Sequence, residues 1–152
     1  MPSKPLSLTR RKAAAAILLL AVALSALVIA RSRGGVLSAH YNVTTTQGRV
    51  DYLAAQGWTV DPKTETSQDV VLPRSFQGAL AEYNTLQLAQ GFDLRPYQGL
   101  ACTVYTYLVP DYGGESPVIA ALYLYRNRII AGDIHSTALD GFMHGIRRSA
   151  PK

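Results

Sequence analysis

The sequence has a single cysteine, and its first 33 positions contain no acidic residue. One cysteine excludes an intramolecular disulfide, so any folded part must be held together by its own core. The glycines lack the spacing of a phosphate-binding loop, and the histidines match no zinc signature. The chain also has no internal repeat and no low-complexity tract. These absences exclude disulfide-stapled, repeat and nucleotide-binding proteins.

The positive charge of the chain is concentrated near its start. The net charge is +5, and residues 1–33 hold six of the fifteen Lys and Arg but none of the ten Asp and Glu. The other 119 residues therefore carry nine basic and ten acidic side chains, a net charge of −1. A basic surface for nucleic acid is not expected in that larger part.

The longest apolar stretch lies within the basic region. Residues 13–30, AAAAILLLAVALSALVIA, are eighteen positions without a charge. As a helix they would cover about 27 Å, against a hydrocarbon core of about 30 Å. Because four of the six basic residues precede this segment, the positive-inside rule predicts a cytoplasmic N-terminus. The four are Lys4, Arg10, Arg11 and Lys12.

These patterns predict a single-pass cell-membrane protein in four parts. They are a cytoplasmic basic tail (1–12), a transmembrane signal-anchor (13–30), a tether (31–46) and an extracytoplasmic domain (47–152). A cleavable secretory signal is the alternative, since small residues at Ala23 and Ser25, or at Val28 and Ala30, suit a signal peptidase. The length of the apolar run favours the uncleaved anchor. An anchor and a cleaved signal would both place the domain on the exported side of the membrane.

The domain is expected to have an α+β fold with an antiparallel sheet. Alternating apolar residues predict a three-strand meander over residues 101–109, 118–125 and 129–134, with a tight turn at 126–128. Shorter strands are expected at 58–60 and 69–72.

Three helices are expected to pack on this sheet. The first spans residues 47–56, is capped by Thr45 or Thr46, and ends at Gly57. The second, expected as the main packed helix, begins at Pro73 and ends near Ala89. Its apolar face carries Phe76, Ala79, Leu80, Tyr83 and Leu86. A short third helix from about Thr137 would pack Leu139, Phe142, Met143 and Ile146 on the domain.

A series of short motifs resembles one bacterial family. The motifs are Gly57-Trp58, YNTLQLAQGFDLRPYQG (83–99), YTYLVPDY (105–112) and AGDIHSTALDGFMHG (131–145). In this order they resemble the domain of unknown function 4830 family. The resemblance implies a small bacterial protein with one N-terminal membrane segment. It brings no activity, cofactor or catalytic residue to transfer.

Acidic and imidazole groups gather near the end of the chain. Asp133 and His135 alternate along a predicted strand, and Asp140 and His144 follow in the predicted last helix. Convergence of these groups would produce a metal site or an acid and base pair. The structural alternative uses the aspartates as helix caps and the histidines as surface donors. The spacing favours the structural interpretation.

Four tyrosines form the second candidate site. Tyr105 and Tyr107 alternate on one strand, Tyr123 and Tyr125 alternate on the next, and the pattern suggests one shared face. Such a patch would stack on a glycan or grip a peptide. The structural alternative is ordinary cross-strand pairing. Cys102 is expected to be a buried apolar residue of its strand and not a nucleophile.

The sequence therefore predicts a non-catalytic binding or interaction module of the bacterial cell envelope. Its expected partners are the membrane and either an envelope protein or a glycan, with no cofactor, nucleic acid or nucleotide. The alternative is an envelope hydrolase or metal-dependent enzyme that uses Asp133, His135 and His144. A third hypothesis assigns residues 13–30 an additional role as a helix interface, although no GxxxG motif is present.

Overall fold

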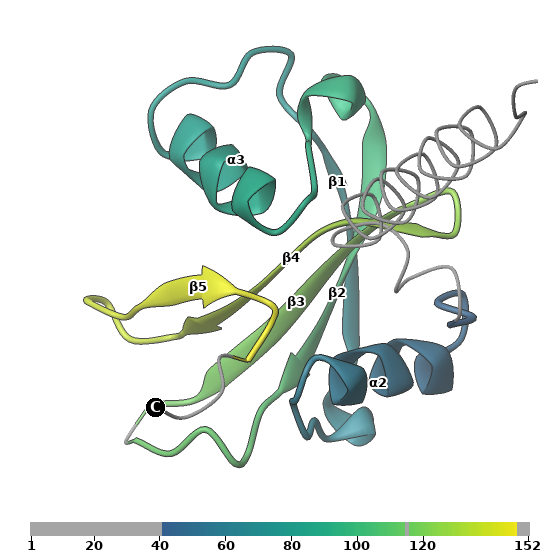
Figure 1. Ribbon diagram of the computed structural model, residues 1–152, viewed down its shortest axis with the longest axis vertical. Coiled ribbons are helices and arrows are strands. Elements are labelled where there is room, and N and C mark those ends of the chain that lie inside the picture. Colours follow the sequence, from purple (N-terminus) through teal and green to yellow (C-terminus); the bar gives the residue numbers. More distant parts are fainter. Residues whose placement is uncertain (1–40, 115, 149–152) are drawn as a thin grey trace, which may run out of the picture. The chain divides into compact units, whose positions relative to one another are not determined.

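The computed structural model describes residues 41–114 and 116–148, which all belong to one compact unit, Gly34–Lys152 (Figure 1). The predicted basic tail, the predicted signal-anchor and the first ten residues of the predicted tether lie outside the described residues. None of the helices that the structure describes is long and apolar enough to cross a membrane.

A five-stranded antiparallel sheet organises the domain. Its strands lie side by side in chain order, and β2, β3 and β4 are the predicted meander (Figure 1). The two short edge strands pair with β2 and β4. The α+β class is therefore confirmed. The bounds are β1 Thr66–Val71, β2 Ala101–Leu108, β3 Val118–Tyr125, β4 Arg128–Ser136 and β5 Met143–Gly145.

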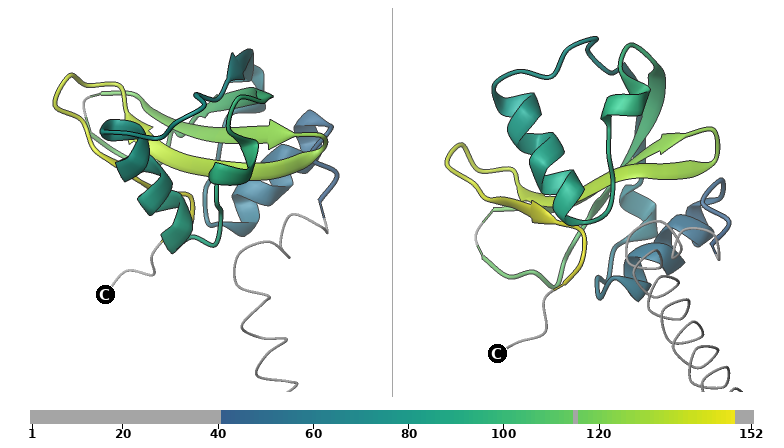
Figure 2. Two further views of the ribbon diagram at one scale, coloured as in Figure 1. Left: turned by 90° about the horizontal axis from the view of Figure 1, so that it is seen from above. Right: turned by 45° about the horizontal axis from the view of Figure 1, so that its top comes forward.

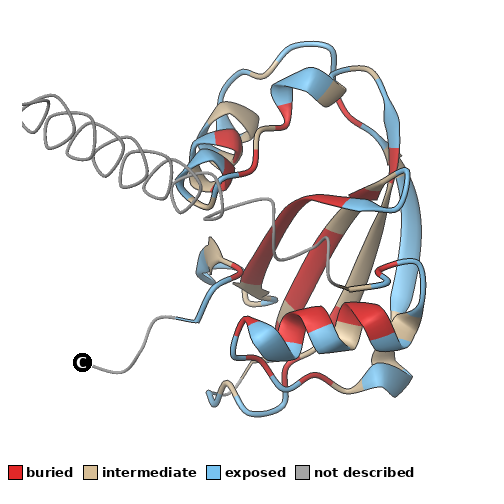
Figure 3. Ribbon diagram, turned by 45° about the vertical axis from the view of Figure 1, so that its right-hand side comes forward, coloured by how far each residue is buried: buried red, intermediate tan, exposed pale blue. Residues whose placement is uncertain are grey.

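Two helices cover opposite faces of this sheet. Tyr52 and Leu53 of α2 (Thr46–Ala55) belong to the larger apolar cluster, together with Tyr107 and Leu122 from the strands. The helix α3 (Ala79–Ala89) contacts the other face, where Cys102 is buried in the smaller cluster. Figure 2 shows the two helices on either side of the sheet, and Figure 3 shows the buried stripe of α2 turned toward it.

The first helix follows the sequence prediction closely. The hydroxyl of Thr45 accepts a hydrogen bond from the amide of Gly48 at the N-terminus. At the other end, the Trp58 amide donates to Leu53 O and the Gly57 amide donates to Ala54 O. This is a Schellman motif, and Gly57 adopts the left-handed φ of 96° that it requires. Local chemistry alone therefore sets the limits of α2.

The second helix is six residues shorter than predicted. Leu72 exchanges hydrogen bonds with Gly99 and Leu100, which extends the sheet-like pairing past β1 and keeps Pro73 out of a helix. Gly78, with φ 55°, directly precedes the first helical turn. The predicted apolar face is only partly buried, and the fully covered residues of α3 are Asn84 and Gln87. Its expected role as the main packed helix was wrong, since the larger core lies under α2.

Three further predictions need correction. The segment 58–60 is not a strand, although Trp58 and Val60 are buried. The predicted helix from Thr137 is a β-hairpin loop followed by β5, because the Gly141 amide turns back to Ala138 O and the Ser136 amide pairs with Phe142 O. Of the residues expected to pack there, only Ile146 is buried. Part of the predicted tether is packed as well, since Val43 lies in the core.

Candidate functional site

The four tyrosines do not form one patch. Tyr105 pairs with Leu122, and Tyr107 pairs with Ala120, so both rings lie on the α2 face of the sheet. Tyr123 pairs with Val104 and therefore points to the α3 face, together with Tyr125. The prediction of a shared face was wrong because the pairing register of β2 with β3 depends on the loop between them. The rings instead pack in separate clusters.

Asp133 and His135 do share a face, and they contact each other beneath α3. The Asp133 carboxylate is buried, with His135 Nδ1 at 2.7 Å from one oxygen. The Tyr83 hydroxyl of α3 donates to the other oxygen at 2.6 Å. Burial raises the pKa of Tyr83 and keeps it a donor, while the bond to Asp133 raises the pKa of His135. The triad of Tyr83, Asp133 and His135 therefore connects α3 to β4.

His144 lies on the opposite face of the sheet from that triad. It pairs with Ile134 in the β4–β5 register, so its ring points toward the side that α2 covers. Asp140 is exposed in the hairpin loop. Within residues 41–114 and 116–148, no three His, Cys, Asp or Glu side chains lie close enough to hold a metal ion. Asp133 and His135 therefore do not converge with His144, and the alternative of a shared metal or acid–base site is not supported.

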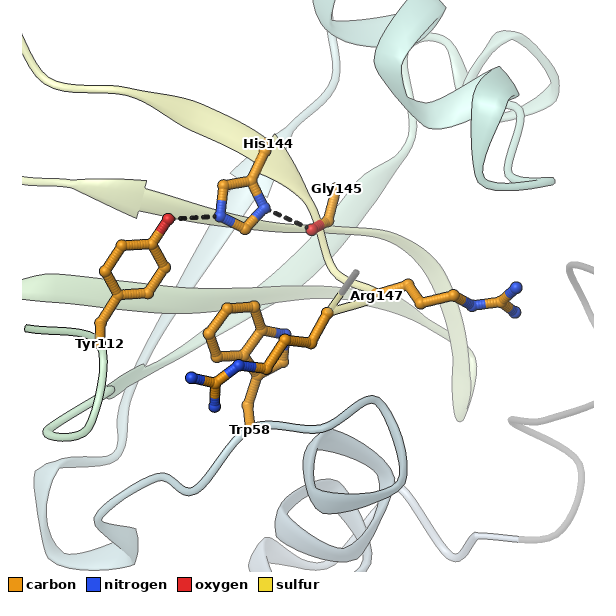
Figure 4. Close-up of a pocket in the computed structure, with 6 residues that line it drawn as sticks. Trp58, Tyr112, His144, Gly145 and Arg147 are labelled. Atoms are coloured by element: carbon orange, nitrogen blue, oxygen red, sulfur yellow. Dashed lines mark hydrogen bonds between the residues drawn. The ribbon is translucent and has the colours of Figure 1, made fainter. Parts of the chain in front are cut away.

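The best-defined pocket lies where β5 meets the end of α2. It is open to solvent, has a volume of about 400 Å³ and is drawn in Figure 4. Three chain segments build it: Trp58 at the end of the Schellman motif of α2, the loop between β2 and β3, and residues 144–148. The lining residues are Trp58, Tyr112, His144, Gly145, Arg147 and Arg148.

Aromatic rings form the floor of this pocket. Tyr112 stacks on Trp58 with ring centroids 5.5 Å apart, and His144 lies 5.8 Å from both rings. Phe142 extends the stack, 4.8 Å from Tyr112 and 5.5 Å from His144. Because Phe142 is 40% exposed, the stack runs from the core to solvent.

Hydrogen bonds fix the position of the two inner rings. Trp58 Nε1 donates to Ile146 O at 2.6 Å, which holds the indole against the end of β5. His144 Nδ1 lies 2.8 Å from Gly145 O, so this nitrogen carries the proton. In the neutral ring, Nε2 then accepts from the Tyr112 hydroxyl at 2.9 Å (Figure 4). These bonds hold the indole and the imidazole in defined positions.

Two arginines contribute to the lining of the pocket. The Arg148 guanidinium lies 4.7 Å from the Trp58 ring and donates to Gly57 O and to Asp111 Oδ2, both at 3.1 Å. A side chain at position 57 would meet Cβ of Arg148 at 2.9 Å, so glycine permits this approach. Arg147 is exposed and forms no ion pair among the described residues. The arrangement suits a ligand with an apolar group and a negative charge.

The sequence indicated only part of this pocket. His144 was expected in a metal or acid–base site, Trp58 in a strand and Tyr112 in a loop. The adjacent Gly57 and Trp58 could have indicated the pocket. A glycine that ends a helix holds the next residue at a fixed position relative to that helix, and here that residue is the only tryptophan. Contacts between segments 32 to 88 positions apart in the chain have no local signature.

Comparison with protein families identifies the class of the domain. The family model described as Domain of unknown function (DUF4830) matches residues 52–134, more than half of the chain. The chain belongs to this family. Comparisons with curated proteins and with solved structures return no match. The matched region contains Trp58 and Tyr112, and it ends before His144 and the two arginines.

Proposed function

We propose that the chain is a membrane-anchored, non-catalytic binding module of the bacterial cell envelope. The binding site is the aromatic pocket, which we define as the six lining residues and the adjoining Phe142. The supporting observation is the chemistry of these residues: stacked rings that reach solvent beside the guanidinium group of Arg148. A pocket with apolar walls and a few fixed polar groups is typical of ligand sites.

The enzyme hypothesis receives less support from the same geometry. The Asp133 carboxylate already accepts hydrogen bonds from Tyr83 and His135 beneath α3. His144, the third expected participant, belongs to the aromatic pocket on the other face. Cys102 is buried, and burial raises the pKa of its thiol, which disfavours the nucleophilic thiolate. Binding is therefore the function that the geometry favours.

Site-specific photocrosslinking in the native host tests the binding proposal. A photoreactive amino acid replaces either Phe142, in the pocket, or Val71, which is 68% exposed on the β1 edge. We expect a discrete covalent adduct from position 142 and none from position 71. The Tyr112→Ala change should reduce the adduct from position 142, because it removes the ring between Trp58 and Phe142.

Two outcomes would contradict the proposal. One is the absence of an adduct at position 142, and the other is an equal adduct pattern at positions 142 and 71. Circular dichroism of the Tyr112→Ala protein serves as a folding control, so that loss of the adduct is not confused with loss of structure.

A further inference from the structure

The carboxylate of Asp111 already lies on the guanidinium group of the pocket. Asp111 Oδ2 accepts from Arg148 Nη1, and the next residue, Tyr112, stacks its ring on Trp58. The loop therefore presents an acidic side chain to the arginine and an apolar ring to the indole from two consecutive residues. Among the described residues, no second carboxylate pairs with either Arg147 or Arg148.

The bond between Arg148 and Asp111 is easily exchanged. The two side chains are 44% and 39% exposed, and a solvated ion pair of this kind contributes little to stability. The guanidinium does not depend on Asp111 for its position, because Gly57 O and the Trp58 ring also hold it. A second carboxylate would find Arg148 already in place.

We propose that the pocket binds a peptide segment in which an acidic side chain is followed directly by an apolar one, and that the ligand carboxylate displaces Asp111 from Arg148. This inference rests on the proposed function and specifies its ligand. The apolar side chain lies against Tyr112 and Phe142, where the ring stack reaches solvent. A site of about 400 Å³ is near the lower end of ligand sites, roughly 300–1,000 Å³, and accepts only a short part of a peptide.

The charge around the pocket gives the bound peptide a direction. Arg147 and Arg148 lie at the end of the chain that follows β5, whereas Asp140 lies in the loop that precedes it. The acidic side chain of the ligand therefore binds at the arginine end, and the part that extends toward the hairpin loop is neutral or basic. Like charges would repel each other in the reverse orientation.

The fluorescence of Trp58 reports binding directly, because it is the only tryptophan in the chain. The full chain, purified in a mild non-ionic detergent, is titrated with acetyl-Ala-Asp-Phe-amide and with acetyl-Ala-Asn-Phe-amide, which differ in charge at one side chain. We expect the aspartate peptide to bind about tenfold or more tightly, as for a charge-assisted hydrogen bond. Arg148→Gln should abolish this preference, whereas Arg126→Gln, on the exposed β3–β4 turn, should preserve it.

The decisive variant is Asp111→Asn, because it should improve binding. Removal of the competing carboxylate is expected to increase the affinity for the aspartate peptide about twofold to fivefold and to leave the affinity for the asparagine peptide unchanged. Equal affinity for the two peptides would overturn the inference, and so would unchanged or weaker binding by Asp111→Asn. Selective binding of acetyl-Ala-Ala-Phe, with its free terminal carboxylate, would also overturn it. In each case an adduct at position 142 would leave the binding proposal intact.

Discussion

At the scale of single residues, Arg49 is the most consequential polar side chain in the core. It is 3% exposed, and its guanidinium donates to Glu65, to the Tyr107 hydroxyl and to Val43 O. The Tyr107 hydroxyl donates in turn to Glu65, and the Tyr105 ring lies 3.7 Å from the guanidinium carbon. The network connects α2 to β2 and to the segment before β1. The arginine therefore donates to a group in each of the segments that the network connects.

We expect Arg49→Met to lower the free energy of unfolding by about 2–4 kcal/mol. The change leaves Glu65 and the Tyr107 hydroxyl without their cationic partner in a largely buried site. Urea denaturation measures the loss. The matched control is Arg95→Met, which breaks an exposed pair with Asp93 and should cost less than about 1 kcal/mol. An equal loss of unfolding free energy in the two variants would show that the burial of Arg49 does not increase its contribution to stability.

His135 should make the stability of the domain depend on pH. Its hydrogen bond to Asp133 raises its pKa in the folded state above the ordinary value of 6.5. The pair therefore contributes fully below about pH 6.5, and the contribution is lost as pH rises through the folded-state pKa. We expect the stability difference between the native chain and His135→Gln to be largest in mild acid and to shrink at higher pH. Urea denaturation across a pH series would contradict this if the difference grew with pH.

At the scale of elements, the contact of α3 with the sheet is unusual because buried amide side chains form part of it. The side chain of Gln87 is fully buried, and it accepts from the Gly132 amide at 3.0 Å and donates to Gly132 O at 3.1 Å. The strand β5 pairs only with residues 133–135 of β4, so Gln87 satisfies the next backbone groups of that edge. Gln90 continues this arrangement by donating to Gly132 O and accepting from the Ile146 amide.

We expect Gln87→Leu to destabilise the domain by about 1–3 kcal/mol, since it leaves the Gly132 amide without a partner and leaves the Gly132 carbonyl with Gln90 as its side-chain donor. The amide of Gly132 should exchange with deuterium faster in this variant, which hydrogen exchange would detect. The control is Gln47→Leu in α2, where the glutamine is exposed and bonds only to Asp51. That change should cost less than about 0.5 kcal/mol. Unchanged protection of Gly132 would refute this role of Gln87.

Elements whose limits depend on local chemistry could be predicted from the sequence. The Thr45 cap and the Gly57 stop set α2, and the turn at Arg126 and Asn127 joins β3 to β4 with φ 45° and 63°. The polar face of α3 could not be predicted, because burial of Gln87 is favourable only where Gly132 presents unpaired backbone groups. For the same reason β5 was missed, since a three-residue strand forms only beside β4.

At the scale of the whole molecule, residues 13–30 are expected to set the membrane topology. We expect the chain to fractionate with membranes and its C-terminal domain to be accessible to protease added outside the cytoplasm. The physical reason is the length of residues 13–30 and the basic flank that precedes them. Reporter fusions at the C-terminus measure the orientation. Activity of a C-terminal reporter that works only in the cytoplasm would contradict the predicted orientation. Complete release of the chain from membranes would contradict the predicted anchor.

The sequence alone determined the charge division of the chain, the absence of a disulfide, the family and the α+β class, because composition and local periodicity carry these properties. Tertiary structure decided which side chains meet. The register of β2 with β3 separated the tyrosines, and β5 turned His144 away from Asp133 and toward Trp58. Side chains on a strand alternate between faces, so a shift of one position moves each to the other face. The proposed binding site therefore depends on the folded arrangement.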